Sequence, residues 1–559
     1  MKFDEILEHI GEFGWYQKRV YFILCLPALI CGLQVLSPVF TLATPLHRCK
    51  LPNYSNDTYE IQNDYQEYLI NISIPPSDVD SSDYSECMIY SDVNFSAPHE
   101  FRWSNTSAPR STRTCKEWVY DKSEYDLSAI EEFSIVCEDT IMRSHSNMVQ
   151  FSGALFGAIF MGFIADCLGR KKAIMLTLLI QFGSSLGIYL APSYQAMTII
   201  RFFTGIAAYS LFAISATTGI ELVGPAKRTF TGVVVEIYWC VGILLLLPIA
   251  YLLPNWRHIQ LAMCILTVPL FSIWWLIPES PRWLLDKGRY TEAEEILQKI
   301  CRSNQTKLPQ DALIPETRTQ CPHTKIWNMF THRVLIVRTF IVFFNWLAVN
   351  LLYYGISLSL DNLAGSTYVN FLIGGVVELV AYAVCLLLLD RTGRKKMYCV
   401  SMFIGAISCL AVVLPITLGN QSHMWIATVL AMIGKLCSSA CYAILYILSA
   451  ELFPTVIRNS GIGFCSVFEN IGGMISPYIA DMGIVLGGAF AQGLPMTVFG
   501  TVSIIAAFLS LFLPETLHRT LPETIQDAID FDKQQRYDRN GSKVPVVEVE
   551  LQVPLTAKE

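Results

Sequence analysis

The chain contains twelve apolar stretches of about twenty residues each, and this pattern limits its possible folds more than any other feature. A helix of that length spans the ~30 Å hydrocarbon layer of a bilayer. Of the 559 residues, 53% are hydrophobic and 16% are charged, which excludes an ordinary water-soluble protein. Helices are the expected state, because they pair all their backbone groups within lipid. We predict an all-α membrane protein with spans near 20–44, 146–165, 173–192, 194–216, 229–252, 258–277, 334–356, 367–389, 397–418, 424–448, 461–485 and 494–513.

Three short signatures occur twice in the same order and divide the chain into two similar halves. Their copies lie 224, 230 and 236 residues apart, and each half contains six of the apolar stretches. Such a chain is a duplicated unit, which is the usual architecture of secondary transporters. The pairs are Asp166-Cys-Leu-Gly169-Arg170 with Asp390-Arg-Thr-Gly393-Arg394, the segment Glu221 to Arg228 with Glu451 to Arg458, and Pro278-Glu279-Ser-Pro-Arg282 with Pro514-Glu515-Thr.

Lysine and arginine in the short loops indicate which side of the membrane each loop faces. Cytoplasmic loops are enriched in these residues, and here they lie before span 1 and after spans 2, 4, 6, 8 and 10. We therefore expect a multi-pass plasma-membrane protein with both termini in the cytoplasm. The expected segments are a cytoplasmic amphipathic segment at 1–19, helix 1 at 20–44, an extracellular loop at 45–143, helices 2 to 6 at 146–277, a cytoplasmic linker at 278–333, helices 7 to 12 at 334–513, and a cytoplasmic tail at 514–559 that is disordered at its end.

The long outer loop has two features of an extracellular segment. Five Asn-x-Ser/Thr sequons predict glycosylation, and four cysteines in an oxidising compartment predict two disulfides, for which three pairings are possible. A further sequon, at Asn304, lies in the cytoplasmic linker and is not expected to be used. No spacing of Cys and His resembles a metal site. The loop residues are Asn53, Asn56, Asn71, Asn94 and Asn105 with Cys49, Cys87, Cys115 and Cys137.

The paired Asp-x-x-Gly-Arg signature places a carboxylate, a glycine and basic residues where a helix meets the cytoplasm. The glycine allows a tight turn, and the carboxylate can pair with a cation or with the positive end of a helix in the other half. We predict that these residues form a cytoplasmic gate that holds the two halves together on one side. The gate residues are Asp166, Gly169, Arg170, Glu221, Arg228, Glu279 and Arg282 in the first half and Asp390, Gly393, Arg394, Glu451, Arg458 and Glu515 in the second.

With these signatures the chain resembles the major facilitator superfamily. Within it, the chain is similar to the organic cation, anion and zwitterion transporters, and specifically to the insect-type organic cation transporters. The resemblance covers most of the chain; it departs from the superfamily motif at Cys167 and Leu386. It implies twelve helices in two pseudo-symmetric halves, with alternating access. It rests on the long first outer loop and on Gly11-Glu12-Phe13-Gly14, Tyr16-Gln17-Lys18-Arg19, Glu279-Ser280-Pro281-Arg282-Trp283-Leu284, Tyr353-Tyr354-Gly355, Ala450-Glu451-Leu452-Phe453-Pro454-Thr455 with Arg458-Asn459, and Leu513-Pro514-Glu515-Thr516.

Charged side chains inside membrane spans are costly, so they mark functional positions. The spans contain Glu236, Glu378, Lys435 and Glu469, and Lys435 can pair with one of the glutamates. Such a pair can be structural or part of a gate. Arg201 is a fifth charged residue, at a position that the resemblance assigns to helix packing.

The resemblance bears on the charge of the substrate. Cation carriers usually have glutamate at the position of Glu378, whereas anion carriers tend to have a basic residue there. Asn470 stands where cation carriers of the mammalian type have aspartate and anion or zwitterion carriers usually have arginine, and Ala443 replaces a second cation-branch glutamate. Glu469 precedes Asn470 but points about 100° away around the helix, so it is not expected to replace that aspartate.

Aromatic residues supply the other half of cation recognition, since a cation–π contact contributes ~0.5–2 kcal/mol. The resemblance places six aromatic side chains toward the centre of the bundle: Phe212, Tyr238, Trp239, Tyr353, Tyr354 and Tyr446.

These features predict a polyspecific transporter that moves small organic cations or zwitterions by alternating access. It is not expected to be an enzyme, to need a cofactor or to bind nucleic acid, and no Walker-type loop is present for a nucleotide. The alternatives are a carnitine-type zwitterion or organic anion transporter, and a membrane receptor or scaffold that transports nothing.

Overall fold

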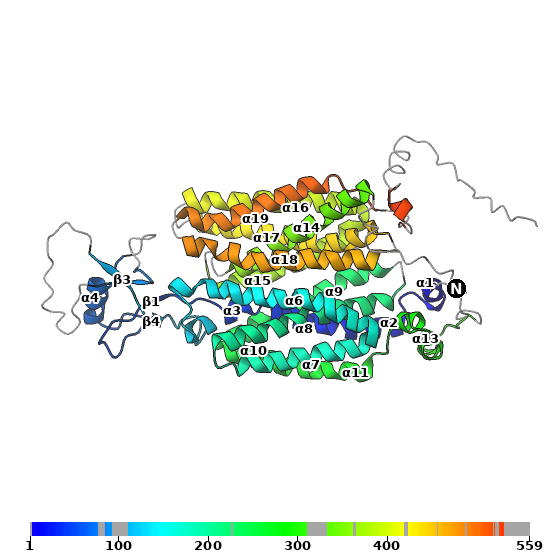
Figure 1. Cartoon of the computed structure of the whole chain (residues 1–559), viewed down its shortest axis with the longest axis horizontal. Coiled ribbons are helices and arrows are strands. Elements are labelled where there is room, and N and C mark those ends of the chain that lie inside the picture. The colour runs from blue at the N-terminus through cyan, green and yellow to red at the C-terminus, as the bar shows by residue number, and fades with distance from the viewer. Residues whose placement is uncertain are drawn as a thin grey trace, which may run out of the picture.

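A computed structural model gives the architecture of the chain (Figure 1). The structure describes residues 3–76, 84–91, 110–224, 227–309, 332–360, 365–418, 423–454, 457–486 and 489–517, the single positions 519 and 522, and residues 525–529. The predicted glycosylation acceptors Asn94 and Asn105, part of the predicted linker and most of the predicted tail lie outside the described residues.

Long helices form two stacked bundles, one from each half of the chain (Figure 1). The helices of the first half are α2 (Trp15–Leu36, continued by α3, Pro38–Thr41), α6 (Ile141–Leu168), α7 (Arg170–Tyr189), α8 (Tyr194–Glu221), α9 (Arg228–Leu252) and α10 (Trp256–Thr267, continued by η4, Val268–Ser272, and α11, Ile273–Leu276). Those of the second half are α14 (Arg333–Leu358), α15 (Thr367–Thr392), α16 (Arg394–Leu418), α17 (Met424–Leu452), α18 (Arg458–Leu486) and α19 (Ala489–Ser510).

Eleven helices of the described chain are long and apolar enough to cross a membrane. The twelfth bundle helix, α18, has 29 residues but does not meet this standard, because Glu469, Asn470 and Asp481 lower its hydropathy. Polar groups of this kind are found where a spanning helix faces the interior of a bundle rather than lipid. The helix α18 does so: it packs between α14 of its own half and α6 of the other.

The two halves meet mainly through two helix pairs, α6 with α18 and α9 with α15, with smaller contacts of α9 with α17 and of α3 with α14. In bundle order the two main pairs are the second helix with the eleventh and the fifth with the eighth. The second and eighth helices correspond in the duplicated halves, as do the fifth and eleventh, so each pair is the counterpart of the other. The interface therefore has the approximate two-fold symmetry that the repeated signatures predict.

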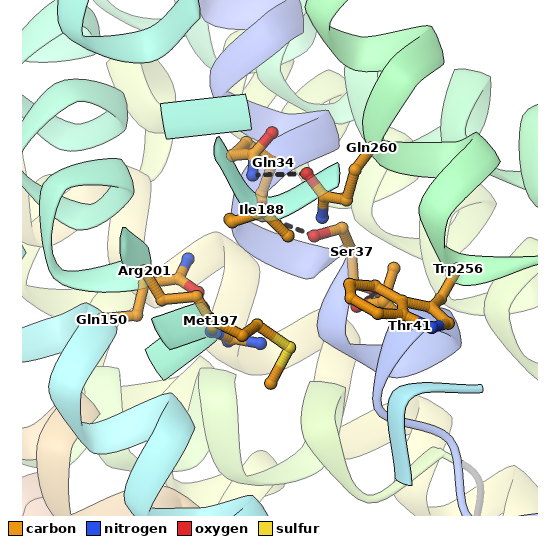
Figure 2. Close-up of a pocket in the computed structure, with 9 residues that line it drawn as sticks. All are labelled: Gln34, Ser37, Thr41, Gln150, Ile188, Met197, Arg201, Trp256 and Gln260. Atoms are coloured by element: carbon orange, nitrogen blue, oxygen red, sulfur yellow. Dashed lines mark hydrogen bonds between the residues drawn. The ribbon is translucent and has the colours of Figure 1, made fainter. Parts of the chain in front are cut away.

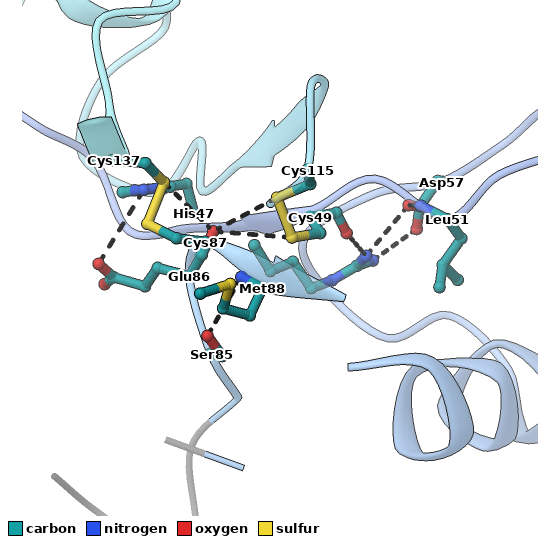
Figure 3. The surroundings of a disulfide bond; sticks show 11 residues. His47, Cys49, Leu51, Asp57, Ser85, Glu86, Cys87, Met88, Cys115 and Cys137 are labelled. Atoms are coloured by element: carbon teal, nitrogen blue, oxygen red, sulfur yellow. Dashed lines mark hydrogen bonds and ion pairs between the residues drawn. A yellow bond between two sulfur atoms is a disulfide. The ribbon is translucent and has the colours of Figure 1, made fainter. Parts of the chain in front are cut away.

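The segment between α3 and α6, which is predicted to be extracellular and which we call the ectodomain, lies at one end of the bundles (Figure 1). It contains two antiparallel strand pairs, β1 (His47–Cys49) with β4 (Trp118–Tyr120) and β2 (Met88–Tyr90) with β3 (Thr112–Thr114), together with α4 (Asp64–Ser73), α5 (Ala129–Glu132) and the short helix η2 (Cys137–Asp139). Two disulfides form, Cys49–Cys115 and Cys87–Cys137, which selects one of the three pairings that the sequence allowed (Figure 3). The acceptors Asn53, Asn56 and Asn71 are exposed here, and their glycosylation stays a prediction.

The N-terminal helix α1 (Phe3–Ile10) and the linker helices α12 (Pro281–Asp286) and α13 (Tyr290–Asn304) cover the opposite end (Figure 1). Ile6, Leu7 and Ile10 are buried against apolar residues of α13. Asn304 joins the two segments: its Oδ1 accepts from the Tyr16 backbone N–H at 3.3 Å, and its Nδ2 donates to the Ile10 carbonyl at 3.2 Å. The Asn304 side chain is thus engaged within the protein.

Candidate functional site

In each half, residues of the three repeated signatures together form one compact ion-pair network at the end opposite the ectodomain. In the first half, Arg170 bonds Asp166 at 2.5 Å and Glu221 at 3.1 Å, and its backbone N–H donates to Glu279 at 2.8 Å. Ser280 closes the network by donating to Glu221 at 2.6 Å. Four elements of this half are therefore tied together at one point.

The second half repeats this network. Arg394 lies 3.0 Å from Asp390 and 3.4 Å from Glu451, and its backbone N–H donates to Glu515 at 2.9 Å. Thr516 donates to Glu451 at 2.5 Å, as Ser280 does to Glu221. The duplication thus extends to individual hydrogen bonds.

The glycines of the two signatures are single-residue turns between consecutive spanning helices. Gly169 has φ +105° and Gly393 has φ +97°, a region that residues with a Cβ rarely adopt. A Cβ would also lie 2.4 Å from Glu279 Oε2 at Gly169 and 2.6 Å from Glu515 Oε2 at Gly393. The glycines are required both by the backbone and by the carboxylates packed on them.

Replacing Gly169 or Gly393 with alanine is expected to destabilise the protein by about 1–3 kcal/mol, the cost of a strained backbone, in addition to the displaced carboxylate. The melting temperature (Tm) of the purified protein measures this effect. Gly162→Ala is the matched control, because Gly162 lies in the same α6 helix with open space around it and ordinary φ. Equal Tm values for Gly162→Ala and Gly169→Ala would contradict the assignment.

The expected bond between the halves is not formed by these residues. In the described chain, the ion pairs and hydrogen bonds of both networks stay within their own half, and the Asp166 and Asp390 side chains are 69% and 66% exposed. Arg228 and Arg282 instead face Asp4 of the N-terminal helix, at 2.6 and 3.9 Å. Arg458 of the second half donates to the Phe453 carbonyl. A gating role of these residues stays a prediction.

The halves are instead joined by a buried ion pair at the end near the ectodomain. Arg143 Nη2 of α6 lies 3.1 Å from Asp481 Oδ1 of α18, and Ser144 Oγ donates to Asp481 Oδ2 at 2.5 Å. Arg143 is 6% exposed and Asp481 3%. We call Arg143, Ser144 and Asp481 the outer latch.

An aromatic cluster at the same end of the bundle also crosses between the halves. Tyr368 and Phe371 of α15 pack against Phe40 of α3, with ring centroids 5.3 and 4.9 Å away. Tyr251 of α9 contacts Tyr368 edge-on at 5.8 Å. These contacts hold the two halves together on the ectodomain side in this structure.

The centre of the bundle contains a fully buried ion pair. Lys435 Nζ of α17 lies 3.2 Å from Glu378 Oε2 of α15. Glu378 Oε1 accepts from the Tyr353 and Tyr382 hydroxyls, both at 2.9 Å. Lys435 donates to Ser357 Oγ at 2.6 Å. Of the three glutamates that could neutralise Lys435, the structure selects Glu378.

Aromatic groups connect this pair to the first half. Lys435 Nζ lies 3.4 Å from the centroid of the Tyr353 ring, a cation–π distance, and Trp239 Nε1 of α9 donates to the Tyr353 hydroxyl at 3.3 Å. The Tyr209 hydroxyl of α8 donates to that of Tyr354 at 2.9 Å. The predicted residues Trp239, Tyr353 and Tyr354 thus meet where the halves join.

Two further carboxylates lie close enough to this group to interact with it electrostatically. Glu236 of α9 interacts with both Glu378 and Glu469, and its carboxylate has no hydrogen-bond or ion-pair partner among the described residues. Glu469 of α18 accepts a hydrogen bond from the Tyr442 hydroxyl. Neighbouring Asn470 is committed to its own helix, where it donates to the Ser466 carbonyl at 2.7 Å.

Of the remaining predicted aromatic residues, two lie near the central group and one does not. Phe212 packs edge-on against Trp239 at 5.4 Å, and Tyr446 interacts electrostatically with both Glu236 and Glu469. Tyr238 was also predicted to face the centre, but it packs against Phe22 of α2. Consecutive residues on a helix point about 100° apart, so Tyr238 and Trp239 do not share a face.

Among the residues of these groups that the sequence reasoning missed are Arg143, Tyr209, Tyr382, Tyr442 and Asp481. Tyr382 could have been found, because it lies one helical turn after Glu378. Asp481 could also have been found, as a carboxylate inside the predicted span 461–485. Arg143 was placed in the outer loop, but α6 already begins at Ile141.

Comparisons with known proteins agree with this architecture. Residues 96–527 match the family described as sugar (and other) transporters. The chain is 35% identical to the organic cation transporter protein of Drosophila melanogaster, covering 95% of each chain. It is 28% identical to the organic cation/carnitine transporter 2 of Homo sapiens, covering 94% of each. The proton:xylose symporter XylE bound to 6-bromo-6-deoxy-D-glucose is a structural neighbour, with TM-score 0.60, 17% identity, and 91% of this chain and 98% of XylE covered.

Proposed function

The chain belongs to the sugar (and other) transporter family and has the major facilitator fold, and from this premise we propose that it carries small organic cations across the plasma membrane. It is a multi-pass membrane transporter and not an enzyme. We propose that both termini lie in the cytoplasm, that residues 45–143 form a glycosylated outer loop, and that the substrate site lies between the halves at the centre of the bundle.

The excess of carboxylates in that centre is the observation that carries the proposal. Glu236 interacts with both Glu378 and Glu469 there, while Lys435 is the one basic residue bonded to any of the three in the described chain. Since Lys435 is paired with Glu378, the carboxyl groups of Glu236 and Glu469 have no basic partner in the described chain and are available to a substrate. A cation entering the site supplies the missing counter-charge, whereas an anion would be repelled.

Aromatic surfaces around the carboxylates support the same substrate class. The rings of Trp239, Tyr442 and Tyr446 lie around the carboxylates, and a ring face contributes ~0.5–2 kcal/mol to the binding of a cation. Ring faces attract cations without a strict hydrogen-bond pattern. We therefore expect broad specificity and modest affinity. For a substrate of charge +1, the membrane potential adds ~2.3 kcal/mol per 100 mV to inward movement.

In the proposed transport cycle the protein alternates between two states, each closed at one end of the bundle. The outer latch and the aromatic cluster close the ectodomain side here, and the paired signatures are proposed to close the cytoplasmic side in the opposite state. Trp239 of the first half is hydrogen-bonded to Tyr353 of the second half, which is bonded to Glu378. A cation bound here would therefore contact both halves between the two ends.

A zwitterion is the second candidate substrate, and Lys435 is the observation that favours it. If Lys435 releases Glu378, its ammonium group becomes available to a substrate carboxylate, while Glu236 and Glu469 hold the cationic end. The human relative is named for organic cations and carnitine. An organic anion without a cationic group is less favoured, because it would meet the two unneutralised carboxylates.

Uptake of labelled tetraethylammonium, carnitine and a small aromatic anion by cells expressing the chain tests the proposal. We expect tetraethylammonium to enter and Glu236→Gln and Glu469→Gln each to reduce its uptake about tenfold, as for a lost contact of ~1.4 kcal/mol. Glu117→Gln, in the ectodomain, is the control that should change nothing. Uptake of the anion alone would reject the cation proposal. A chain that reaches the surface and transports none of the three would favour a receptor or scaffold.

A further inference from the structure

Arg201, on α8, is a buried arginine without a carboxylate partner. Its side chain is 5% exposed, and Nη2 donates to Asn147 Oδ1 at 2.8 Å and to Gln150 Oε1 at 2.6 Å, both on α6. Its Nε has no hydrogen-bond acceptor. The bonds that join α8 to α6 use only Nη2 and leave the other donors of the guanidinium unused.

A buried, uncompensated charge is costly. Arginine stays protonated in proteins, and the effective penalty for burying one unpaired ion is several kcal/mol. Glu132, which accepts from Nε1 of the pocket residue Trp256 at 2.8 Å, is already bound by Arg257 at 2.6 Å. Burial acts to raise the pKa of Glu132, but the hydrogen bonds from Arg257 and Trp256 outweigh it and keep that pKa below its usual value. Glu132 is therefore an ionised partner of Arg257.

The free side of Arg201 faces a small polar pocket inside the first half (Figure 2). It has room for about one water-sized particle. Its lining comes from α2, α3, α6, α7, α8 and α10, and consists of Gln34, Ser37, Thr41, Gln150, Ile188, Met197, Arg201, Trp256 and Gln260. The pocket is separate from the central carboxylates and is not part of the proposed substrate site.

The unused polar groups around this pocket are donors. The hydroxyls of Ser37 and Thr41 donate to backbone carbonyls, at 2.9 and 3.0 Å. Gln260 Oε1 accepts from Gln34 Nε2 at 3.3 Å, and Gln150 Oε1 accepts from Arg201. In the described chain this leaves the amide nitrogens of Gln150 and Gln260, together with Arg201, without acceptors. A site with one positive charge and several unused N–H groups is suited to an anion.

We propose that this pocket binds a small monovalent anion of the size of chloride as the counter-ion of Arg201. Chloride is larger than a water molecule, so the flexible Met197 side chain in the lining must shift to admit it, and it accepts several N–H groups at once. The bound anion neutralises Arg201, completes the hydrogen bonds of Gln150 and Gln260, and stabilises the first half by linking α8 to α10.

Thermal unfolding of the purified full-length protein in chloride and in gluconate, at equal ionic strength, tests the proposal. We expect Tm to rise with chloride along a saturation curve, because a ligand that binds only the folded state stabilises it. Bromide should replace chloride, and the much larger gluconate should not. The same Tm in both salts would overturn the proposal.

Variants separate the anion site from a general salt effect. Arg201→Gln should abolish the chloride-dependent rise, and Gln260→Leu should raise the half-maximal chloride concentration about tenfold, as expected for one lost charged hydrogen bond. Arg19→Gln, which changes an exposed arginine of α2 outside the pocket, should retain the rise. If Arg201→Gln does not fold, Gln260→Leu decides: an unchanged chloride curve in that variant would reject the site.

Discussion

Glu378→Gln is expected to destabilise the protein by about 3–5 kcal/mol and to abolish measurable uptake of tetraethylammonium. Glutamine leaves Lys435 buried without a counter-charge, and breaking a buried ion pair on one side has a cost of this size. It also weakens the hydrogen bonds that hold the Tyr353 and Tyr382 hydroxyls. Tm of the purified protein and uptake per molecule at the cell surface measure the two effects.

The double variant Glu378→Gln with Lys435→Met separates stability from transport. Removing both charges should restore most of the lost Tm, because no unpaired ion remains. Uptake should stay low if Glu378 contributes to the cation site, whereas full recovery of uptake would make the pair purely structural. Lys435→Met alone should lower Tm in the same way as Glu378→Gln, and a normal Tm would show that the ion pair does not form.

Asp481→Asn is expected to open the ectodomain side of the transporter. Its carboxylate accepts from Arg143 and Ser144 across the halves, and in the open state both groups would be hydrated. The lost pair therefore destabilises the closed state selectively. A change of about 3–5 kcal/mol shifts the ratio of the two states by more than a hundredfold.

Labelling of Phe371→Cys with a membrane-impermeant thiol reagent measures this opening. Phe371 is 1% exposed behind Phe40, so the thiol should react slowly from outside in the closed state and much faster in Asp481→Asn. Asp481→Glu keeps the charge and is the matched control. The exchange Arg143→Asp with Asp481→Arg should slow labelling again. Unchanged labelling in Asp481→Asn would show that the outer latch does not hold the halves together.

Local sequence patterns predicted the features that depend on one segment at a time. The twelve apolar stretches located the bundle helices, including α18, whose polar residues lower its hydropathy. The repeated signatures predicted the symmetry of the two networks down to Gly169 and Gly393. The family was recognisable for the same reason, since its signatures are short and contiguous. The presence of two disulfides followed from the cysteine count in the outer loop.

Features that depend on tertiary packing were not predictable in this way. The sequence contains three glutamates that could pair with Lys435. Only the packing of α15 against α17 determines that the partner is Glu378. The Cys49–Cys115 pairing likewise depends on how the ectodomain strands align. The outer latch was missed because Arg143 lies within one turn of the start of α6, where a hydropathy window does not resolve the end of a helix.

The departure from the superfamily motif at Cys167 gives the protein a reporter of its own. It is exposed, whereas the other eleven free cysteines of the described chain are buried. It lies next to Asp166, at the end of the bundle opposite the ectodomain. A fluorophore or spin label on Cys167 would therefore follow the approach of the two halves at that end without an introduced cysteine, once Cys321, outside the described residues, has been replaced with serine.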